Sequence, residues 1–172
     1  MFEYKELVQN VYISPNSDIR CLTPSLIVLH KIALPLQNPS LKTVSDFFCN
    51  RLEYHQSSFL SSLANVKVSS HFVIDFDGTL IQFVEPETRV AWHCGLSQYA
   101  GVKKCNDFSI GIEFLGYDWT DLTNLQYTKG NKLIKALCND FRILPTHVVG
   151  HKDISPARKT DPGFYNKDRL LV

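Results

Sequence analysis

The sequence has no strong excess of either charge and no apolar run long enough to cross a bilayer. Its 18 Lys and Arg residues are nearly balanced by 17 Asp and Glu residues, which leaves a net charge of +1. General nucleic-acid binding usually needs a strongly basic face, and a membrane span needs about 20 apolar residues. We therefore expect neither a nucleic acid nor a membrane as a partner.

Paired cysteine motifs and a secretory leader are also missing. The N-terminal residues 1–6 have no basic region followed by an apolar region, so no secretory signal is visible. The cysteines are odd in number, widely scattered and without a C-x-x-C pair, which argues against a disulfide framework and favours a reducing cytoplasm. They are Cys21, Cys49, Cys94, Cys105 and Cys138.

The length and composition suit one domain. The chain has 172 residues, of which 44% are hydrophobic and 20% charged, as is ordinary for a globular protein with one core. No internal repeat, low-complexity tract or linker divides it. We therefore expect residues 1–172 to form a single domain.

Short apolar runs predict the strands. Residues 25–30 and 108–114 are typical of buried or alternating strands. Residues 71–75 and 80–84 flank Asp77-Gly78, which is a strong hairpin signal. Residues 147–151 predict a short strand that runs into a loop.

Helical spacing of apolar residues appears in two segments. It predicts a short helix over residues 43–54 and a longer one over 123–141, whose start could follow Gly130. The tail, residues 155–172, is expected to be mostly irregular, with a brief helix near 165–170. The irregular order of strands and helices predicts an α/β fold with a central mixed sheet flanked by α-helices.

Three residues of metal-ligand type stand at the ends of predicted elements. His30 ends an apolar strand, His151 follows another, and Asp161 comes ten positions after His151. Two imidazoles and a carboxylate can form a three-ligand zinc set with an open fourth position. The spacing alone is weak evidence, because each His could be structural and Asp161 could simply be a turn residue of Asp-Pro-Gly.

Other polar residues are candidates for chemistry or binding. Glu113 interrupts an apolar strand, where a carboxylate is costly unless it is solvated, paired or functional. Lys159 could reach a developing oxyanion or be a solvated charge. Trp92 could bind a sugar or simply pack, and Lys104 could meet an anionic ligand or face water.

Four blocks of the sequence resemble a known family. Residues 92–99, 105–113 and 150–163, together with His30 followed by Leu34-Pro35, closely resemble zinc amidases of the AmpD type. Those enzymes are cytoplasmic 1,6-anhydro-N-acetylmuramoyl-L-alanine amidases. The hairpin around Asp77-Gly78 also fits, and the similarity runs from about Ile13 to the C-terminus.

The resemblance implies a fold and a set of roles. The fold is the one shared with peptidoglycan-recognition proteins, and the expected partner is a muropeptide bound by a monomer. One Zn²⁺ per chain would be held by His30, His151 and Asp161. Glu113 would act as the acid and base, and Lys159 would stabilise the oxyanion.

The sequence departs from the family at several positions. Lys31 follows the first ligand where Asn is frequent, and Lys67 and Lys104 stand where arginines are usual. Lysine keeps the charge but loses the planar fork of arginine, so substrate preference is less secure than reaction type. The resemblance leaves Lys67, Trp92 and Lys104 as substrate-binding candidates. His71, His93 and His147 match no ligand position and are expected to be structural or to support a ligand.

Three alternatives remain open from the sequence. One is a peptidoglycan-binding module of the same fold that has lost catalysis, which the presence of all three ligand residues and Glu113 argues against. Another is an amidase that acts on intact cell wall, which would need export. A zinc hydrolase of another kind, such as a peptidase, is remote.

Overall fold

A six-stranded mixed sheet forms the centre of the computed structural model, which describes residues 2–170. The strand order is β1-β5-β4-β9-β3-β10, and every neighbouring pair is parallel except β4 with β5. The expected α/β class with a mixed sheet is therefore confirmed. The strands are β1 (Asn10–Val11), β3 (Leu26–Ile32), β4 (Phe72–Ile74), β5 (Leu80–Gln82), β9 (Ser109–Leu115) and β10 (Val148–Gly150).

Two small sheets and the helices complete the described chain. The small sheets pair β2 (Ser17–Ile19) with β6 (Arg89–Ala91), and β7 (Gln98–Tyr99) with β8 (Val102–Lys103). The α-helices are α1 (Leu41–Phe48), α2 (Ser58–Ser62), α3 (Asn124–Phe141) and α4 (His151–Ile154). Short 3-10 helices cover Glu3–Leu7, Tyr54–Gln56, Cys105–Phe108, Pro145–His147 and Lys167–Arg169.

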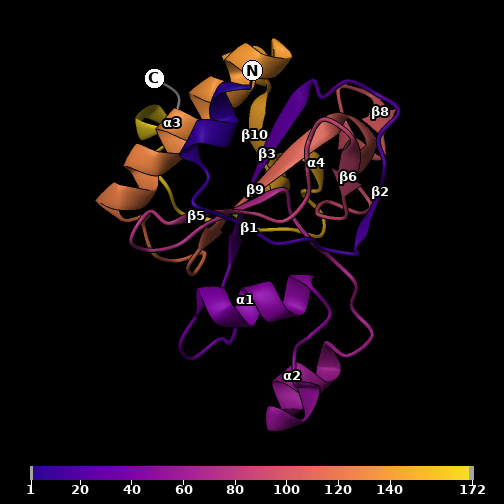
Figure 1. Ribbon diagram of the computed structural model, residues 1–172, viewed down its shortest axis with the longest axis vertical. Helices are drawn as coiled ribbons and strands as arrows, with labels where there is room; N and C mark the ends of the chain where they lie inside the picture. The colour runs from indigo at the N-terminus through magenta and orange to yellow at the C-terminus, as the bar shows by residue number, and fades with distance from the viewer. Residues whose placement is uncertain (1, 171–172) are drawn as a thin grey trace.

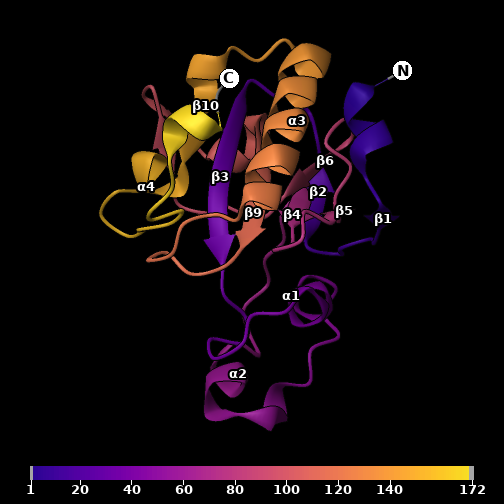
Figure 2. The ribbon, with the colours of Figure 1, turned by 90° about the vertical axis from the view of Figure 1, so that its left-hand side faces the viewer.

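Alternation along β3 and β9 sorts their side chains onto two faces. Ile27 and Leu29 of β3, with Ile110 and Ile112 of β9, pack in the core that includes α3. Leu26 and Val28 belong to a different cluster. Because successive side chains of a strand point to opposite faces, His30 and Glu113 lie on the face away from α3. Figure 2 shows α3 along one side of β3 and β9.

Helices α1 and α2 lie below the sheet in Figure 1, beyond the C-terminal end of β3. Helix α1 begins after Ser40, whose side chain accepts a hydrogen bond from the Thr43 amide. It ends at Phe48, so the predicted helix over residues 43–54 is wrong in its second half. Asn50 has a φ of 56° in the left-handed region, which a continuing helix does not allow.

The strands and the hairpin predicted from apolar runs are confirmed to within about two residues. The long helix α3 is also confirmed. It begins before Gly130 because Thr123 and Gln126 form a capping box. In the tail, only Lys167–Arg169 forms a 3-10 helix where residues 165–170 were expected to be helical. Residues 171 and 172 of that tail lie outside the described part.

Several short elements are not predicted by the sequence, notably β2, β6, α2 and α4. Their lengths of three to five residues are too small for a periodic pattern to appear. Among residues 2–170, no helix combines the length and apolar character that crossing a membrane requires.

Candidate metal centre

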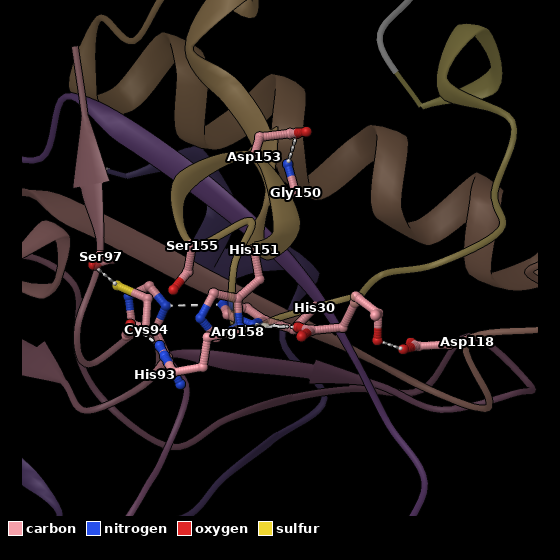
Figure 3. Close-up of polar contacts among 12 residues, drawn as sticks. His30, His93, Cys94, Ser97, Asp118, Gly150, His151, Asp153, Ser155 and Arg158 are labelled. Atoms are coloured by element: carbon pink, nitrogen blue, oxygen red, sulfur yellow. Dashed lines mark hydrogen bonds and ion pairs between the residues drawn. The ribbon is translucent and has the colours of Figure 1, made fainter.

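One histidine of the predicted ligand set lies in a strand, and the other directly follows the neighbouring strand. His30 lies near the end of β3, and His151 begins α4 directly after β10, which pairs with β3. Helix α4 starts at that point because the Asp153 carboxylate accepts a hydrogen bond from the Gly150 amide at 2.7 Å, which Figure 3 shows. Both histidine side chains are only 2% exposed.

Asp161 completes the cluster from the loop that follows α4. Its Oδ2 lies 3.0 Å from His30 Nδ1 and 3.1 Å from His151 Nδ1. The ligand atoms of the three residues all lie within 4.8 Å of one another. Within residues 2–170, this is the single group of His, Cys, Asp and Glu side chains compact enough to hold a metal ion.

Burial and charge suit these groups to bind a cation. Burial lowers the pKa of His30 to about 4, although the hydrogen bond and charge of Asp161 oppose this shift. For Asp161, burial raises the pKa, but hydrogen bonds from His151 and His30 outweigh it and hold the pKa well below its usual range. Neutral imidazole and ionised carboxylate are the forms that bind metals. The donor set of two nitrogens and one oxygen fits Zn²⁺ with an open position.

Glu113 lies beside this cluster without joining it. It is paired with His30 in the β3–β9 register, is 8% exposed, and its Oε2 has no hydrogen-bond partner. Burial raises its pKa well above the ordinary value, and the nearby Asp161 adds to the rise while Lys159 opposes it. A buried carboxyl with an unused oxygen is costly for stability, which indicates a functional group.

His93 contacts His30 through the ring nitrogen that does not face Asp161. His30 Nε2 lies 2.9 Å from His93 Nδ1, and His93 Nε2 lies 3.0 Å from Ser109 Oγ, which donates to the Cys105 carbonyl at 2.5 Å. Figure 3 draws the contacts of His30, His93 and His151. When His30 Nδ1 binds a metal, its Nε2 carries the proton and donates to His93, whose own proton must then lie on Nε2.

Gly111 makes room for that imidazole. A Cβ at this position would lie 2.6 Å from His93 Cγ and 2.7 Å from His93 Nδ1. Those separations are shorter than any real contact of a Cβ atom, so β9 needs glycine opposite His93.

Five of the eight predicted site residues line one cavity of about 190 Å³. They are His30, Glu113, His151, Lys159 and Asp161. The other three do not line it. Lys67 is exposed and donates to Asn50 Oδ1 at 3.2 Å, and Trp92 donates to Asp18 Oδ2 at 2.6 Å. Lys104 is exposed and lines a separate cavity of about 440 Å³.

Two residues near the centre carry contacts that no sequence motif signals. Ser109 fixes His93, but a serine at the start of a strand has no distinctive pattern. Lys31 is buried at 8% exposure next to His30, and its ammonium donates to the carbonyls of Thr120 and Phe164. The resemblance marked Lys31 only as a departure from the family. Its contacts cannot be read from the local sequence, because those acceptors lie 89 and 133 residues away.

Several known proteins with related sequences and structures are amidases. Residues 20–164 match the N-acetylmuramoyl-L-alanine amidase family. The 1,6-anhydro-N-acetylmuramyl-L-alanine amidase AmpD of Escherichia coli K12 is 39% identical over 152 residues, which cover 87% of this chain and 82% of that protein. A crystal structure of a selenomethionine AmpD derivative is 34% identical, covers 94% of this chain and 91% of its own, and has a TM-score of 0.90.

A further solved relative contains a ligand. The amidase AmiD from E. coli, in complex with the substrate anhydro-N-acetylmuramic acid-L-Ala-D-γ-Glu-L-Lys, is 28% identical with a TM-score of 0.59. That match covers 82% of this chain and 53% of the AmiD chain. The resemblance read from the sequence motifs is thus confirmed, and the chain belongs to the N-acetylmuramoyl-L-alanine amidase family.

Proposed function

We propose that this protein is a zinc amidase that hydrolyses the amide between 1,6-anhydro-N-acetylmuramic acid and L-alanine in muropeptides, as part of peptidoglycan recycling. The observation that carries the proposal is the convergence of His30, His151 and Asp161, with ligand atoms within 4.8 Å, beside the unpartnered carboxyl of Glu113. The names of the related AmpD enzymes and the substrate bound to AmiD support the choice of substrate.

The three donors would hold one Zn²⁺ per chain. When bound, zinc supplies a Lewis acid that polarises the amide carbonyl and lowers the pKa of water to about 7. Asp161 supplies the negative charge, and the imidazoles of His30 and His151 complete the set. A cation in this site also opposes the effects that raise the pKa of Glu113, because an opposite charge nearby favours the ionised carboxylate.

Glu113 would transfer the proton, and Lys159 would stabilise the negative charge that develops on the carbonyl oxygen. In its ionised form, Glu113 takes a proton from the attacking water and then donates it to the nitrogen of the leaving L-alanine. Lys159 lines the same cavity, and its ammonium stabilises the negative oxygen of the tetrahedral intermediate. The products are the anhydromuramyl sugar and a peptide that begins with L-alanine.

Lys67, Trp92 and Lys104 remain proposed contacts for substrate. They lie outside the metal cavity, so they are suited to bind parts of the muropeptide away from the scissile amide. Lys104 stands in the left-handed region at φ 62° and borders the neighbouring cavity. We further propose that residues 1–172 act as one amidase domain and as a monomer. A cytoplasmic location stays a prediction, with which the five free cysteines are compatible.

The direct test uses purified protein and anhydromuramyl-tripeptide. We expect release of a peptide with N-terminal L-alanine, its loss on treatment with a chelator, and its return on addition of Zn²⁺. Intact sacculi serve as the comparison substrate and separate a recycling enzyme from one that acts on the cell wall. Binding of the muropeptide without cleavage by the zinc-loaded protein would instead indicate a recognition module and overturn the proposal.

A further inference from the structure

Lys31 and His30 are consecutive residues of β3, so their side chains point to opposite faces of the sheet. Both residues border the metal cavity, but Lys31 pairs in register with Phe114, which packs on the α3 side. The loop that carries Asp161 reaches both of them. Asp161 Oδ2 contacts His30 Nδ1, and three residues later the Phe164 carbonyl accepts from Lys31 Nζ.

The ammonium of Lys31 joins two separate loops. It donates to the carbonyl of Thr120 at 2.5 Å and to that of Phe164. In the described part of the chain no carboxylate forms an ion pair with it. A buried ammonium is costly without good partners, so these two carbonyls are what hold the charge in place. An apolar side chain of similar length would have no N–H to donate to either loop.

The same two loops are joined at further points. The Phe164 amide donates to the Asp118 carbonyl at 2.7 Å, and Thr160 Oγ1 donates to Asp118 Oδ2 at 2.8 Å. Gly163 fits closely here, because a Cβ would lie 2.2 Å from the Asp118 carbonyl oxygen. Asp161 therefore lies in a short segment that is fixed at Thr160 and at Phe164, and its own carbonyl accepts a hydrogen bond from the Lys152 amide at 2.9 Å.

We propose that Lys31 is a positioning residue for the metal centre: by fastening the loop of Asp161 to the strand of His30, it helps to set the separation of these two ligands before any ion binds. The inference rests on the proposed metal centre and adds a residue to it. Its physical basis is preorganisation, since a ligand loop that is already ordered loses less conformational freedom when the ion binds.

The test compares Lys31→Met with a matched control. Methionine is unbranched and of similar length but has no N–H donor. The control is Lys129→Met, because Lys129 Nζ also donates to a backbone carbonyl, that of Leu7 at 3.4 Å, but from α3. Zinc affinity is measured by competition with a chromophoric chelator. The visible spectrum of the Co²⁺-substituted protein reports ligand geometry, and thermal unfolding of the metal-free protein reports stability.

We expect Lys31→Met to weaken zinc binding by about 10- to 100-fold, the range typical of residues that orient metal ligands, and to change the Co²⁺ spectrum. Lys31→Arg keeps N–H donors for both carbonyls and should recover most of the affinity. Lys129→Met should bind zinc as the wild type does. A purely structural role would lower the unfolding temperature of metal-free Lys31→Met and leave its zinc affinity and Co²⁺ spectrum unchanged, which would overturn the proposal.

Thr160→Val tests the same idea without altering Lys31. It removes the hydroxyl that bonds Asp118 at the exposed end of the segment, so the protein should fold even if Lys31→Met does not. We expect a smaller loss of zinc affinity in the same direction, and wild-type affinity in a folded Thr160→Val would contradict the role given to the loop attachment. Absence of zinc binding in the wild type would overturn the metal centre itself, which distinguishes that failure from a failure of Lys31 alone.

Discussion

His30 and Glu113 occupy paired positions on the adjacent parallel strands β3 and β9. Neighbouring strands lie about 4.8 Å apart, and paired residues project from the same face. The sheet therefore presents a proposed metal ligand and a carboxyl side by side on two paired strands. Asp161 arrives from a loop, which explains why its position needs additional support.

Glu113→Gln should separate catalysis from metal binding. The amide keeps the size of the side chain but cannot accept and return a proton, so activity on anhydromuramyl-tripeptide should fall by about 100- to 10,000-fold. Zinc content, measured by elemental analysis, should stay at one ion per chain because Glu113 is not among the three grouped ligands. Glu53→Gln, at an exposed position that does not line the cavity, is the control. Turnover close to that of the wild type would remove Glu113 from the mechanism.

Asp161→Asn should weaken the binding of the metal ion. The carboxylate is the sole negative charge among the three donors, and both imidazoles are oriented by its Oδ2. Loss of a supporting residue typically weakens metal binding by about 10- to 100-fold, so loss of a charged ligand should exceed that. Chelator competition measures the change, and activity should disappear with the ion. A variant that retains wild-type zinc affinity would show that Asp161 is not a ligand.

The sequence predicts the strands that carry the site more readily than it predicts that the three ligand residues meet in space. The apolar runs before His30 and around Glu113 identify β3 and β9, because buried strands need continuous or alternating apolar residues. The spacing of His151 and Asp161 follows no comparable sequence pattern. Their meeting with His30 depends on the parallel pairing of β10 with β3 and on a loop path, and only the family resemblance supplied it.

Local features near the site were the least predictable. Helix α1 ends at Phe48, because Asn50 in the next turn has a left-handed backbone conformation. The spacing of the apolar residues does not indicate this helix end. Helix α4 has four residues, too few for a periodic signal. The contacts of Lys31 join residues that are 89 and 133 positions apart, so the sequence around Lys31 holds no trace of them.

The thiols should differ sharply in their reactivity. Cys21 is exposed, whereas Cys105 is fully buried and Cys94 is 1% exposed. Burial raises the pKa of Cys94 to about 12, and the thiolate is the form that reacts. With Ellman's reagent we expect one fast thiol per native chain, removed by Cys21→Ser, and five thiols in denaturant. Fewer than five in denaturant without reductant would reveal a disulfide.

His93 should tune the first ligand through its acceptor nitrogen. The contact of 2.9 Å between His93 Nδ1 and His30 Nε2 requires His93 to accept once His30 Nδ1 binds the ion. His93→Leu leaves the Nε2 proton of His30 without an acceptor, and a buried donor left unsatisfied costs about 1–3 kcal/mol. His93→Asn offers an amide oxygen near the position of Nδ1 and should retain more of the zinc affinity than His93→Leu.

The comparison isolates the hydrogen bond from the loss of the ring, since both variants remove the imidazole and the contact with Ser109. Chelator competition and the Co²⁺ spectrum are the measurements, with His147→Leu as the control at a histidine that instead contacts the Ser25 carbonyl. We expect zinc affinity to be lower in His93→Asn than in the wild type. We expect it to be lower again in His93→Leu, by about tenfold or more relative to His93→Asn. Equal affinity in the two variants would mean that packing of the ring, and not its acceptor nitrogen, supports His30.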